Sequence, residues 1–256
     1  MCPKFVDLSV PLRNAGPREP GGRERIRYHA HRATAWGMTR FFRGLRTRDL
    51  PDREGWAYER IRLSTHHGTH LDAPYHYAST MDGGKRAITI DEVPLDWCFQ
   101  PGVRLDFRTF PDGYVVTAKD VAAELERIGH RLSPLEIVLV NTAAGAAQGE
   151  ADYIDRGCGM GREATLYLLE QGVRVTGTDA WSWDAPFVHT ARRFRETGDA
   201  SLIWEGHRVG RDIGYCHIEK LGNLEALPDK GFKVSCFPVK IEGASAGWTR
   251  AVAIID

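Results

Sequence analysis

The feature that most constrains this chain is the stretch His66–Tyr77, whose sequence is HHGTHLDAPYHY. Its twelve residues hold four of the chain's ten histidines together with one carboxylate, Asp72. Imidazole and carboxylate groups are the usual protein ligands of zinc, manganese and related divalent ions. A loop that needed only to be soluble would not require this composition, so we expect a metal site here.

The spacing inside this stretch predicts three metal ligands. An extended backbone places His70 and Asp72 on one face, because successive side chains of a strand alternate between its two faces. Gly68 lets the chain turn closely, so that His66 can reach the same point. Three protein ligands with one open position are typical of a catalytic rather than a structural metal.

His76 has a different expected role, because it lies four residues beyond Asp72 and after Pro74. It is close enough to reach a metal-bound water or a substrate without being a ligand itself. An imidazole that titrates near neutrality is suited to passing protons. His67 lies between two proposed ligands and is expected to point the other way, with a structural role.

Composition excludes several classes of partner. The 34 basic and 34 acidic residues leave no cationic excess for nucleic acid, and no apolar run approaches the roughly 20 residues that span a membrane. The five cysteines are odd in number, widely spread and free of any C-x-x-C pair. We therefore expect a protein of the reducing cytoplasm, without a secretory signal or a disulfide framework.

The hydrophobic pattern predicts an α/β fold. Helices are expected at 117–128 and 162–171, a strand buried on both faces at 136–141, and a strand at 58–65 that leads into the histidine cluster. Strands interspersed with a few helices, with no linker or repeat, predict one domain over residues 1–256 with a mixed sheet.

Several aromatic side chains are candidates to hold an aryl or heterocyclic substrate, although each could equally belong to the core. They are Trp36, Phe41, Phe42, Trp181 and Trp183. The first three lie in the segment 27–45, which either lines or covers a pocket or is a peripheral insertion that packs on the core. Cys216 next to His217 suggests a catalytic pair of a thiol and an imidazole. Adjacent strand residues point in opposite directions, however, so an inert cysteine is expected.

The motif H-x-G-T-H-x-D-x-P-x-H, from His66 to His76, resembles the signature of the cyclase family of metal-dependent hydrolases, which includes bacterial kynurenine formamidases and isatin hydrolases. Five further parts of the chain resemble segments of that family. They are the opening strand at 5–9, the T-D-x-x-S segment at 178–182, the I-E-x-L-x-N-L segment at 218–224, and the closing strands at 238–244 and 250–253.

This resemblance implies a second half of the metal site. Asp72 would bridge from the first metal to a second one held by His207 and Glu219, with His76 as the proton-transfer residue. Glu219 favours two zinc ions per subunit, because the isatin branch has glutamine there and one manganese, which remains the alternative. The family also implies a partly barrel-like sheet flanked by a few helices, of the swivelling β/β/α type, and a homodimer or homotetramer.

Three functions follow as hypotheses. The first is a metal-dependent hydrolase that cleaves the C–N bond of an aryl formamide or related aromatic amide, with metal-activated water as nucleophile and His76 as proton relay. The second opens the ring of a cyclic amide, imide or lactone. The third, from another class, is a non-catalytic metal-dependent ligand-binding protein.

Overall fold

The computed structural model describes residues 2–14 and 25–255, and the chain divides into two compact units. We call Met1–Leu12 together with Thr65–Asp256 the main unit, and Arg13–Ser64 the hairpin unit. The single domain expected over residues 1–256 stays a prediction.

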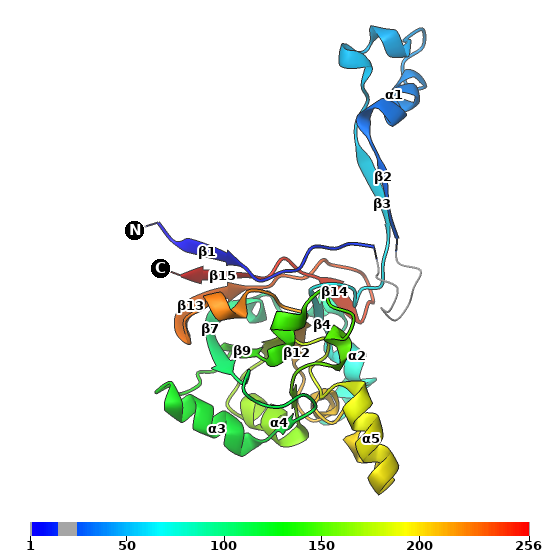
Figure 1. Cartoon of the computed structure of the whole chain (residues 1–256). Helices are drawn as coiled ribbons and strands as arrows, with labels where there is room; N and C mark the ends of the chain where they lie inside the picture. The colour runs from blue at the N-terminus through cyan, green and yellow to red at the C-terminus, as the bar shows by residue number, and fades with distance from the viewer. Residues whose placement is uncertain (1, 15–24, 256) are drawn as a thin grey trace. The chain divides into compact units, whose positions relative to one another are not determined.

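The main unit is built around one nine-stranded sheet (Figure 1). Its strands, in their spatial order, are β1 (Lys4–Asp7), β15 (Val252–Ile255), β13 (Lys230–Ser235), β7 (Phe99–Asp106), β9 (Ile137–Asn141), β11 (Val175–Thr178), β12 (Cys216–Glu219), β4 (His70–Asp72) and β14 (Ala246–Trp248). The four central strands, β7, β9, β11 and β12, are parallel, and the strands on either side of them pair antiparallel. The sheet curls strongly into a half-barrel. The predicted mixed α/β fold is therefore confirmed.

Helices α3 (Ala118–Arg127), α4 (Arg162–Glu170) and α5 (Phe187–Thr197) lie in the connections between the parallel strands, whereas α2 (Pro74–Tyr77) follows β4. The predicted helices at 117–128 and 162–171 correspond to α3 and α4. Thr117 caps α3 by accepting a hydrogen bond from the backbone N–H of Asp120. Helix α5 was not predicted from the sequence, because the segment lacks a broad apolar stripe. In the structure, Thr190 is the one buried residue of this helix.

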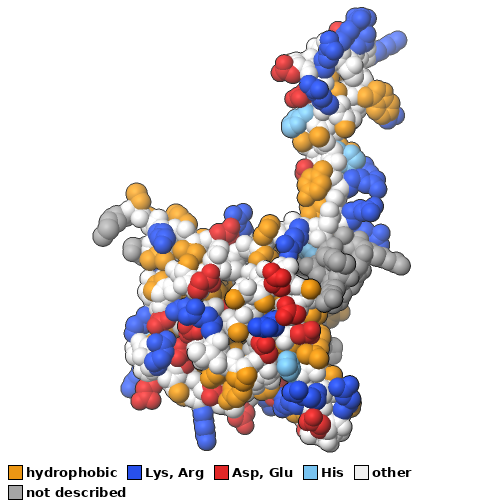
Figure 2. Space-filling model, viewed as in Figure 1, with side chains coloured by type: hydrophobic (Ala, Val, Ile, Leu, Met, Phe, Trp, Pro, Cys, Tyr) orange, Lys and Arg blue, Asp and Glu red, His pale blue; other side chains and the backbone are white. Residues whose placement is uncertain are grey.

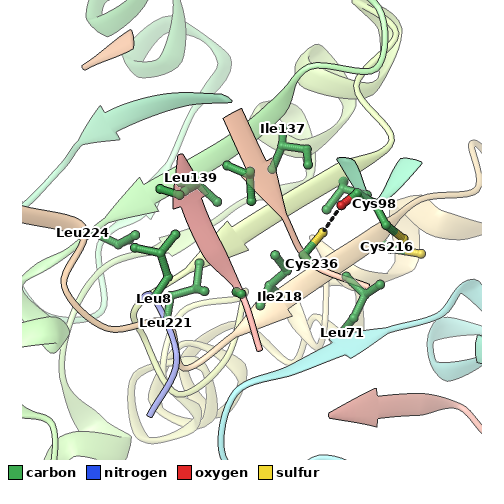
Figure 3. Close-up of a cluster of buried hydrophobic side chains, with 14 of the residues drawn as sticks. Leu8, Leu71, Cys98, Ile137, Leu139, Cys216, Ile218, Leu221, Leu224 and Cys236 are labelled. Carbon is green, nitrogen blue, oxygen red and sulfur yellow. Dashed lines mark hydrogen bonds between the residues drawn. The ribbon is translucent and has the colours of Figure 1, made fainter. Parts of the chain in front are cut away.

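One hydrophobic cluster of the main unit joins strands from distant parts of the chain (Figure 3). Leu71 of β4, Ile218 of β12 and Ile137 of β9 all lie in it and are fully buried. Cys216 lies in the same cluster, and burial raises the pKa of its thiol well above the ordinary value. The expectation that Cys216 is inert thus has a physical basis, since the thiolate is strongly disfavoured there.

Small paired strands complete the chain. In the main unit, β8 (Val115–Val116) pairs with β10 (Gly159–Met160), and β5 (Thr80–Met81) pairs with β6 (Lys85–Arg86). In the hairpin unit, β2 (Arg25–His29) pairs antiparallel with β3 (Tyr58–Arg62), and α1 (His31–Thr39) lies between them in the sequence. The strand expected at 58–65 therefore ends at Arg62, and its pairing partner is β2.

Candidate metal centre

Two antiparallel neighbours, β4 and β12, provide the core of the candidate site. In their register Asp72 lies opposite His217, and His70 lies opposite Glu219. Because side chains alternate along each strand, these four residues project from the same face, while the residues between them enter the hydrophobic cluster of Figure 3. All four side chains are buried. Strand pairing thus gathers two histidines and two carboxylates from distant parts of the chain.

The Asp72 carboxylate lies at the centre of four histidines. Its Oδ1 is 2.8 Å from Nδ1 of His66 and 3.3 Å from Nε2 of His70. Its Oδ2 is 3.1 Å from Nε2 of His217 and 4.0 Å from Nε2 of His76. The structure therefore brings the predicted residues of the first half of the site around one carboxylate.

The Glu219 carboxylate is a second point of convergence. Its Oε1 is 3.3 Å from Nε2 of His217 and 3.7 Å from Nε2 of His207. Its Oε2 is 3.6 Å from Nε2 of His70. His207, at the start of the short 3-10 helix His207–Arg211, is therefore close to Glu219 as the family resemblance implied.

Two overlapping groups of side chains have ligand atoms that all lie within 4.8 Å of one another. One group is Asp72, His207, His217 and Glu219, and the other is His66, Asp72 and His76. Asp72 belongs to both groups, which matches its expected bridging role. His70 lies beside both carboxylates without completing either group, and the half-buried His67 lies outside both.

Each histidine of this centre, apart from His76, has its second ring nitrogen engaged by another group. The contacts are His66 Nε2 with Ser245 Oγ at 3.1 Å, His70 Nδ1 with the Gly68 carbonyl at 2.9 Å, His217 Nδ1 with Tyr215 Oη at 3.4 Å, and His207 Nδ1 with the Asp184 carboxylate. Such partners orient metal-binding imidazoles and set which nitrogen faces the metal. The remaining nitrogens are the ones that face Asp72 and Glu219.

Buried atoms without regular hydrogen bonds support a cation here. Among the described residues, Nε2 of His70, Nε2 of His217 and both carboxylate oxygens of Asp72 have no partner with hydrogen-bond geometry. Buried polar atoms in proteins are nearly always satisfied, so such a cluster indicates an additional group. A divalent ion fits this donor set, because imidazole and carboxylate atoms converge on it from several sides.

The electrostatics also favour a cation. Burial raises the pKa of Asp72, but the facing histidines outweigh this effect and lower it well below the ordinary value. Burial lowers the pKa of His217, but the neighbouring carboxylates of Asp72 and Glu219 outweigh this effect and raise it to about 9. A raised pKa on a fully buried imidazole indicates a strongly negative environment. A divalent ion would supply the compensating charge.

His76 lies at the more open side of this group, with its side chain 20% exposed. Its ring centre is 4.2 Å from that of His66 and 5.2 Å from that of Trp204. Burial lowers the pKa of His76 to about 4, although Asp72 acts in the opposite direction. Its imidazole is therefore neutral at physiological pH, and it does not titrate near neutrality as expected from the sequence, because burial disfavours the charged form.

The predicted substrate aromatics are distributed over different environments. Trp183 is fully buried, its indole N–H donates to Thr165 Oγ1, and its ring stacks near His217, so it belongs to the core beneath the ligands. Trp181 is half-buried. Trp36, Phe41 and Phe42 belong to the hairpin unit and are 65%, 73% and 55% exposed, so they do not pack into its interior. A role in substrate binding stays a prediction for these residues.

Two neighbours of the centre were missed in the sequence. Trp204 stacks on His207 with ring centres 4.7 Å apart. Lys220 has a left-handed φ of 60° and places its ammonium 3.5 Å from Glu219 Oε2 and 4.9 Å from the centre of the Trp181 ring. The position of Lys220 directly after Glu219, a proposed ligand, could have marked it as a neighbour of the site.

His217 was also missed as a candidate ligand, although a signal was present. It lies two residues before Glu219, so that a strand places both on one face. The same rule had been used to separate His217 from Cys216, but not to group it with Glu219.

Comparisons with known proteins show the family of this chain. The model of the Cyclase family, described as "Putative cyclase", matches residues 6–185. The chain belongs to this family. It is 28% identical over 193 residues to the kynurenine formamidase of Salinibacter ruber, covering 75% of this chain and 77% of the relative. The resemblance predicted from the His66–His76 motif is confirmed.

Solved structures of isatin hydrolases share the fold of this Cyclase family chain. Isatin hydrolase A from Labrenzia aggregata, bound to benzyl benzoate, aligns with a TM-score of 0.75 and 24% identity over 99% of this chain and 94% of its own. Isatin hydrolase A from Ralstonia solanacearum aligns with a TM-score of 0.75 and 20% identity over 99% and 92%. Within the described residues, no helix has the length and apolar character needed to cross a membrane.

Proposed function

We propose that this chain is a metal-dependent hydrolase that cleaves the C–N bond of an aryl formamide or a related aromatic amide. The observation that carries the proposal is the sharing of Asp72 between two groups of candidate ligands. Family membership and the similarity to a kynurenine formamidase support the reaction class. We propose zinc as the metal, with two ions per chain, and manganese as the alternative.

The proposed ligands divide into two sets that meet at Asp72. His66, His70 and Asp72 would hold one ion, since His66 and His70 both lie beside Oδ1 of Asp72. Asp72, His207 and Glu219 would hold the other ion, with His217 as an additional donor. When bound, the ions would supply Lewis acidity, lowering the pKa of a water and stabilising negative charge on the amide oxygen. Buried Asp184 would keep His207 oriented through its contact with Nδ1.

His76 is the proposed proton relay. Its neutral imidazole accepts a proton from the attacking water and returns it to the leaving nitrogen. This nitrogen is a poor leaving group until it is protonated. Its position on α2, directly after β4, holds the ring near Asp72 while leaving one side accessible. A protein that only bound ligands would not need this residue, so its presence favours an enzyme.

The substrate is proposed to be a small aromatic amide. Half-buried Trp181 and Trp204 provide aromatic surfaces beside the ligands, and aromatic rings favour such stacked or tilted contacts. The ammonium of Lys220 next to Trp181 adds a positive charge that would suit a carbonyl or carboxylate on the substrate. Nothing in this arrangement suits nucleic acid.

A ring-opening hydrolase of a cyclic amide, imide or lactone is the second candidate. The alignment of isatin hydrolase structures with 99% of this chain favours it, because the shared fold would present the same ligand positions. Both reactions attack a carbonyl carbon next to nitrogen or oxygen, and they differ in whether the leaving group stays attached.

A panel of substrates after chelation tests these candidates. The purified protein is stripped with a chelator, reloaded with zinc or manganese, and assayed on a formanilide-like amide, an isatin-like cyclic amide and an aryl lactone. We expect hydrolysis that disappears on stripping, returns on reloading and is fastest for the open-chain formamide. Fastest turnover of the cyclic amide would select the second candidate. Bound metal without hydrolysis of any compound would select a binding protein.

We also propose a homodimer or homotetramer located in the cytoplasm. All five cysteines, which lie within the described residues, are free thiols, and four of them are buried. Reduced cysteines suit a reducing compartment.

A further inference from the structure

The His76 ring is held in a different way from the other histidines of the candidate metal centre. The 4.0 Å between its Nε2 and Oδ2 of Asp72 is too long for a hydrogen bond, and within the described residues no other group is hydrogen-bonded to the ring. The torsion that turns a histidine ring about its Cβ–Cγ bond has broad minima. Packing against neighbouring side chains must therefore set the direction of both ring nitrogens.

Two aromatic rings lie closest to that of His76. The ring centre of His66 is 4.2 Å away and that of Trp204 is 5.2 Å away, both in tilted arrangements. His66 is a proposed ligand, so a bound metal would fix its place. Trp204 offers no ligand atom, and its ring also stacks on His207 at 4.7 Å with 9° between the two planes. Trp204 thus connects a proposed ligand with the proposed proton relay through ring packing.

The backbone at Trp204 is strained. Its φ is 57°, in the left-handed region, where bulky side chains are genuine outliers. Such a conformation persists where the surrounding structure over-determines the backbone, and residues of this kind gather at functional sites. A right-handed or extended backbone at this position would send the indole in another direction.

The chain directly after Trp204 is held by charged groups. Acidic and basic side chains are interspersed over the main unit (Figure 2), and Glu205 accepts a hydrogen bond from the Arg193 guanidinium at 3.4 Å. The backbone N–H of Gly206 donates to the Asp184 carboxylate at 2.7 Å. These contacts hold the left-handed turn in place, and the turn in turn fixes the indole.

We propose that Trp204 is the positioning residue of the proton relay. Its indole holds the His76 imidazole by ring packing in the direction that proton transfer requires, and the strained backbone presents the indole there. This role depends on the relay function proposed above for His76 and names what orients the ring. Orientation matters because misplacing a reacting group by about 1 Å can cost about 10²-fold in rate.

Nuclear magnetic resonance of the histidine rings tests the positioning without an assay of turnover. The full chain is labelled with histidine that carries ¹³C at Cε1 and is kept with zinc, which is diamagnetic. The His76 signal is identified by its absence from His76→Gln. We expect its order parameter to fall from roughly 0.85 in wild type to below roughly 0.6 in Trp204→Ala. Trp204→Phe, which keeps a ring, should stay near wild type. An unchanged order parameter in Trp204→Ala would overturn the proposal.

A double-mutant cycle shows whether Trp204 acts through His76. Trp204→Ala should lower kcat by about 10²-fold in the wild-type chain, because the relay loses its orientation. In a His76→Ala background the same change should cost less than about threefold, since no ring is left to orient. An equal loss in both backgrounds, or a loss of metal from Trp204→Ala, would overturn the proposal. If the chain hydrolyses no amide, imide or lactone, the proposed function fails, and the order of the His76 ring still decides the role of Trp204.

Trp181→Ala is the matched control. Trp181 is also half-buried beside the centre, but its ring packs on Phe187, with ring centres 5.7 Å apart. The variant should leave the order of the His76 ring unchanged and lower kcat by the same factor with and without His76. Loss of ring order in Trp181→Ala equal to that in Trp204→Ala would overturn a specific role for Trp204.

Trp204→Gly separates the ring from the backbone strain. Glycine adopts a φ of 57° without a steric penalty, whereas alanine keeps that penalty. We expect Trp204→Gly to melt at a higher temperature than Trp204→Ala, while both lose the order of the His76 ring. A lower melting temperature of the glycine variant would overturn the strained presentation of the indole, and a retained order of His76 in it would overturn the role of the indole.

Discussion

The two faces of the β4–β12 strand pair carry opposite kinds of side chain. One face holds His70, Asp72, His217 and Glu219, and the first three of these carry buried polar atoms without a hydrogen-bond partner. The opposite face holds the intervening apolar residues, which pack into the hydrophobic cluster of Figure 3. The same few residues of backbone therefore serve both the candidate chemistry and the stability of the sheet.

Adjacent residues of these strands therefore contribute to different properties, one to the candidate metal site and the next to the stability of the sheet. Alternation along a strand gives neighbouring residues different environments. A substitution on the ligand face removes a donor, whereas a substitution on the core face removes packing. Changes to adjacent residues should consequently have different signatures.

The largest contrast is expected between Asp72→Asn and Leu71→Ala. Asp72→Asn should lower activity by at least about 10³-fold, because metals contribute several kcal/mol to the transition state. Leu71 is fully buried, so Leu71→Ala should lower the free energy of unfolding by about 2–5 kcal/mol. Assays and denaturant unfolding measure both quantities. The division into a ligand face and a core face would be wrong if Leu71→Ala lost metal while remaining folded, or if Asp72→Asn kept full activity.

The substitution His76→Ala separates metal binding from proton transfer. It should lower turnover by about 10²–10⁴-fold, because a positioned acid–base group contributes roughly that factor. The metal content should stay at the wild-type value, measured on the same preparation. Loss of one metal ion per chain would show that His76 is a ligand, and undiminished turnover would remove it from the mechanism.

Asp179 is a buried carboxylate outside the candidate metal centre, and its surroundings differ from those of Asp72. It is as buried as Asp72, but its partners are the neutral donors of Asn141 and Thr142. Burial outweighs those hydrogen bonds and raises its pKa to about 7.

Stability that depends on protonated Asp179 is fully present below the unfolded pKa near 3.8 and is lost as pH rises through about 7. Up to about 4 kcal/mol is involved for a shift of this size. We expect Asp179→Asn to flatten the fall in unfolding free energy between pH 4 and pH 8, measured by urea unfolding of chelated protein. An identical pH profile for wild type and variant would contradict this assignment.

The smallest effects are expected for residues that orient the ligands. Asp184→Asn should weaken metal binding by about 10–100-fold, because its carboxylate contacts Nδ1 of His207. Ser245→Ala, which removes a neutral hydroxyl from His66, should cost less, since bonds to charged groups are stronger. Chelator competition at fixed pH ranks the two. The reverse ranking would show that His66 depends more on its outer contact than His207 does.

The first half of the site was predictable from sequence because its information is local. His66, His70 and Asp72 lie within seven residues, and strand alternation relates two of them directly. Likewise α3 was predictable from its Thr117 cap and from Val121 and Leu125 at helical spacing, both of which are buried.

The second half was not predictable from the residues alone. It depends on β12 pairing with β4, a contact between segments far apart in the chain, which no periodicity reveals. Family resemblance supplied His207 and Glu219, but it did not supply His217 or Trp204. The surroundings of these residues arise from tertiary packing, as does the partial burial of Lys220.

We propose that one carboxylate, Asp72, is shared by two metal ions. Elemental analysis of metal per chain, on wild type, Glu219→Gln and Asp72→Asn purified in parallel, tests it most directly. We expect about two ions in wild type, about one in Glu219→Gln and none in Asp72→Asn. Equal metal content in wild type and Asp72→Asn would contradict it.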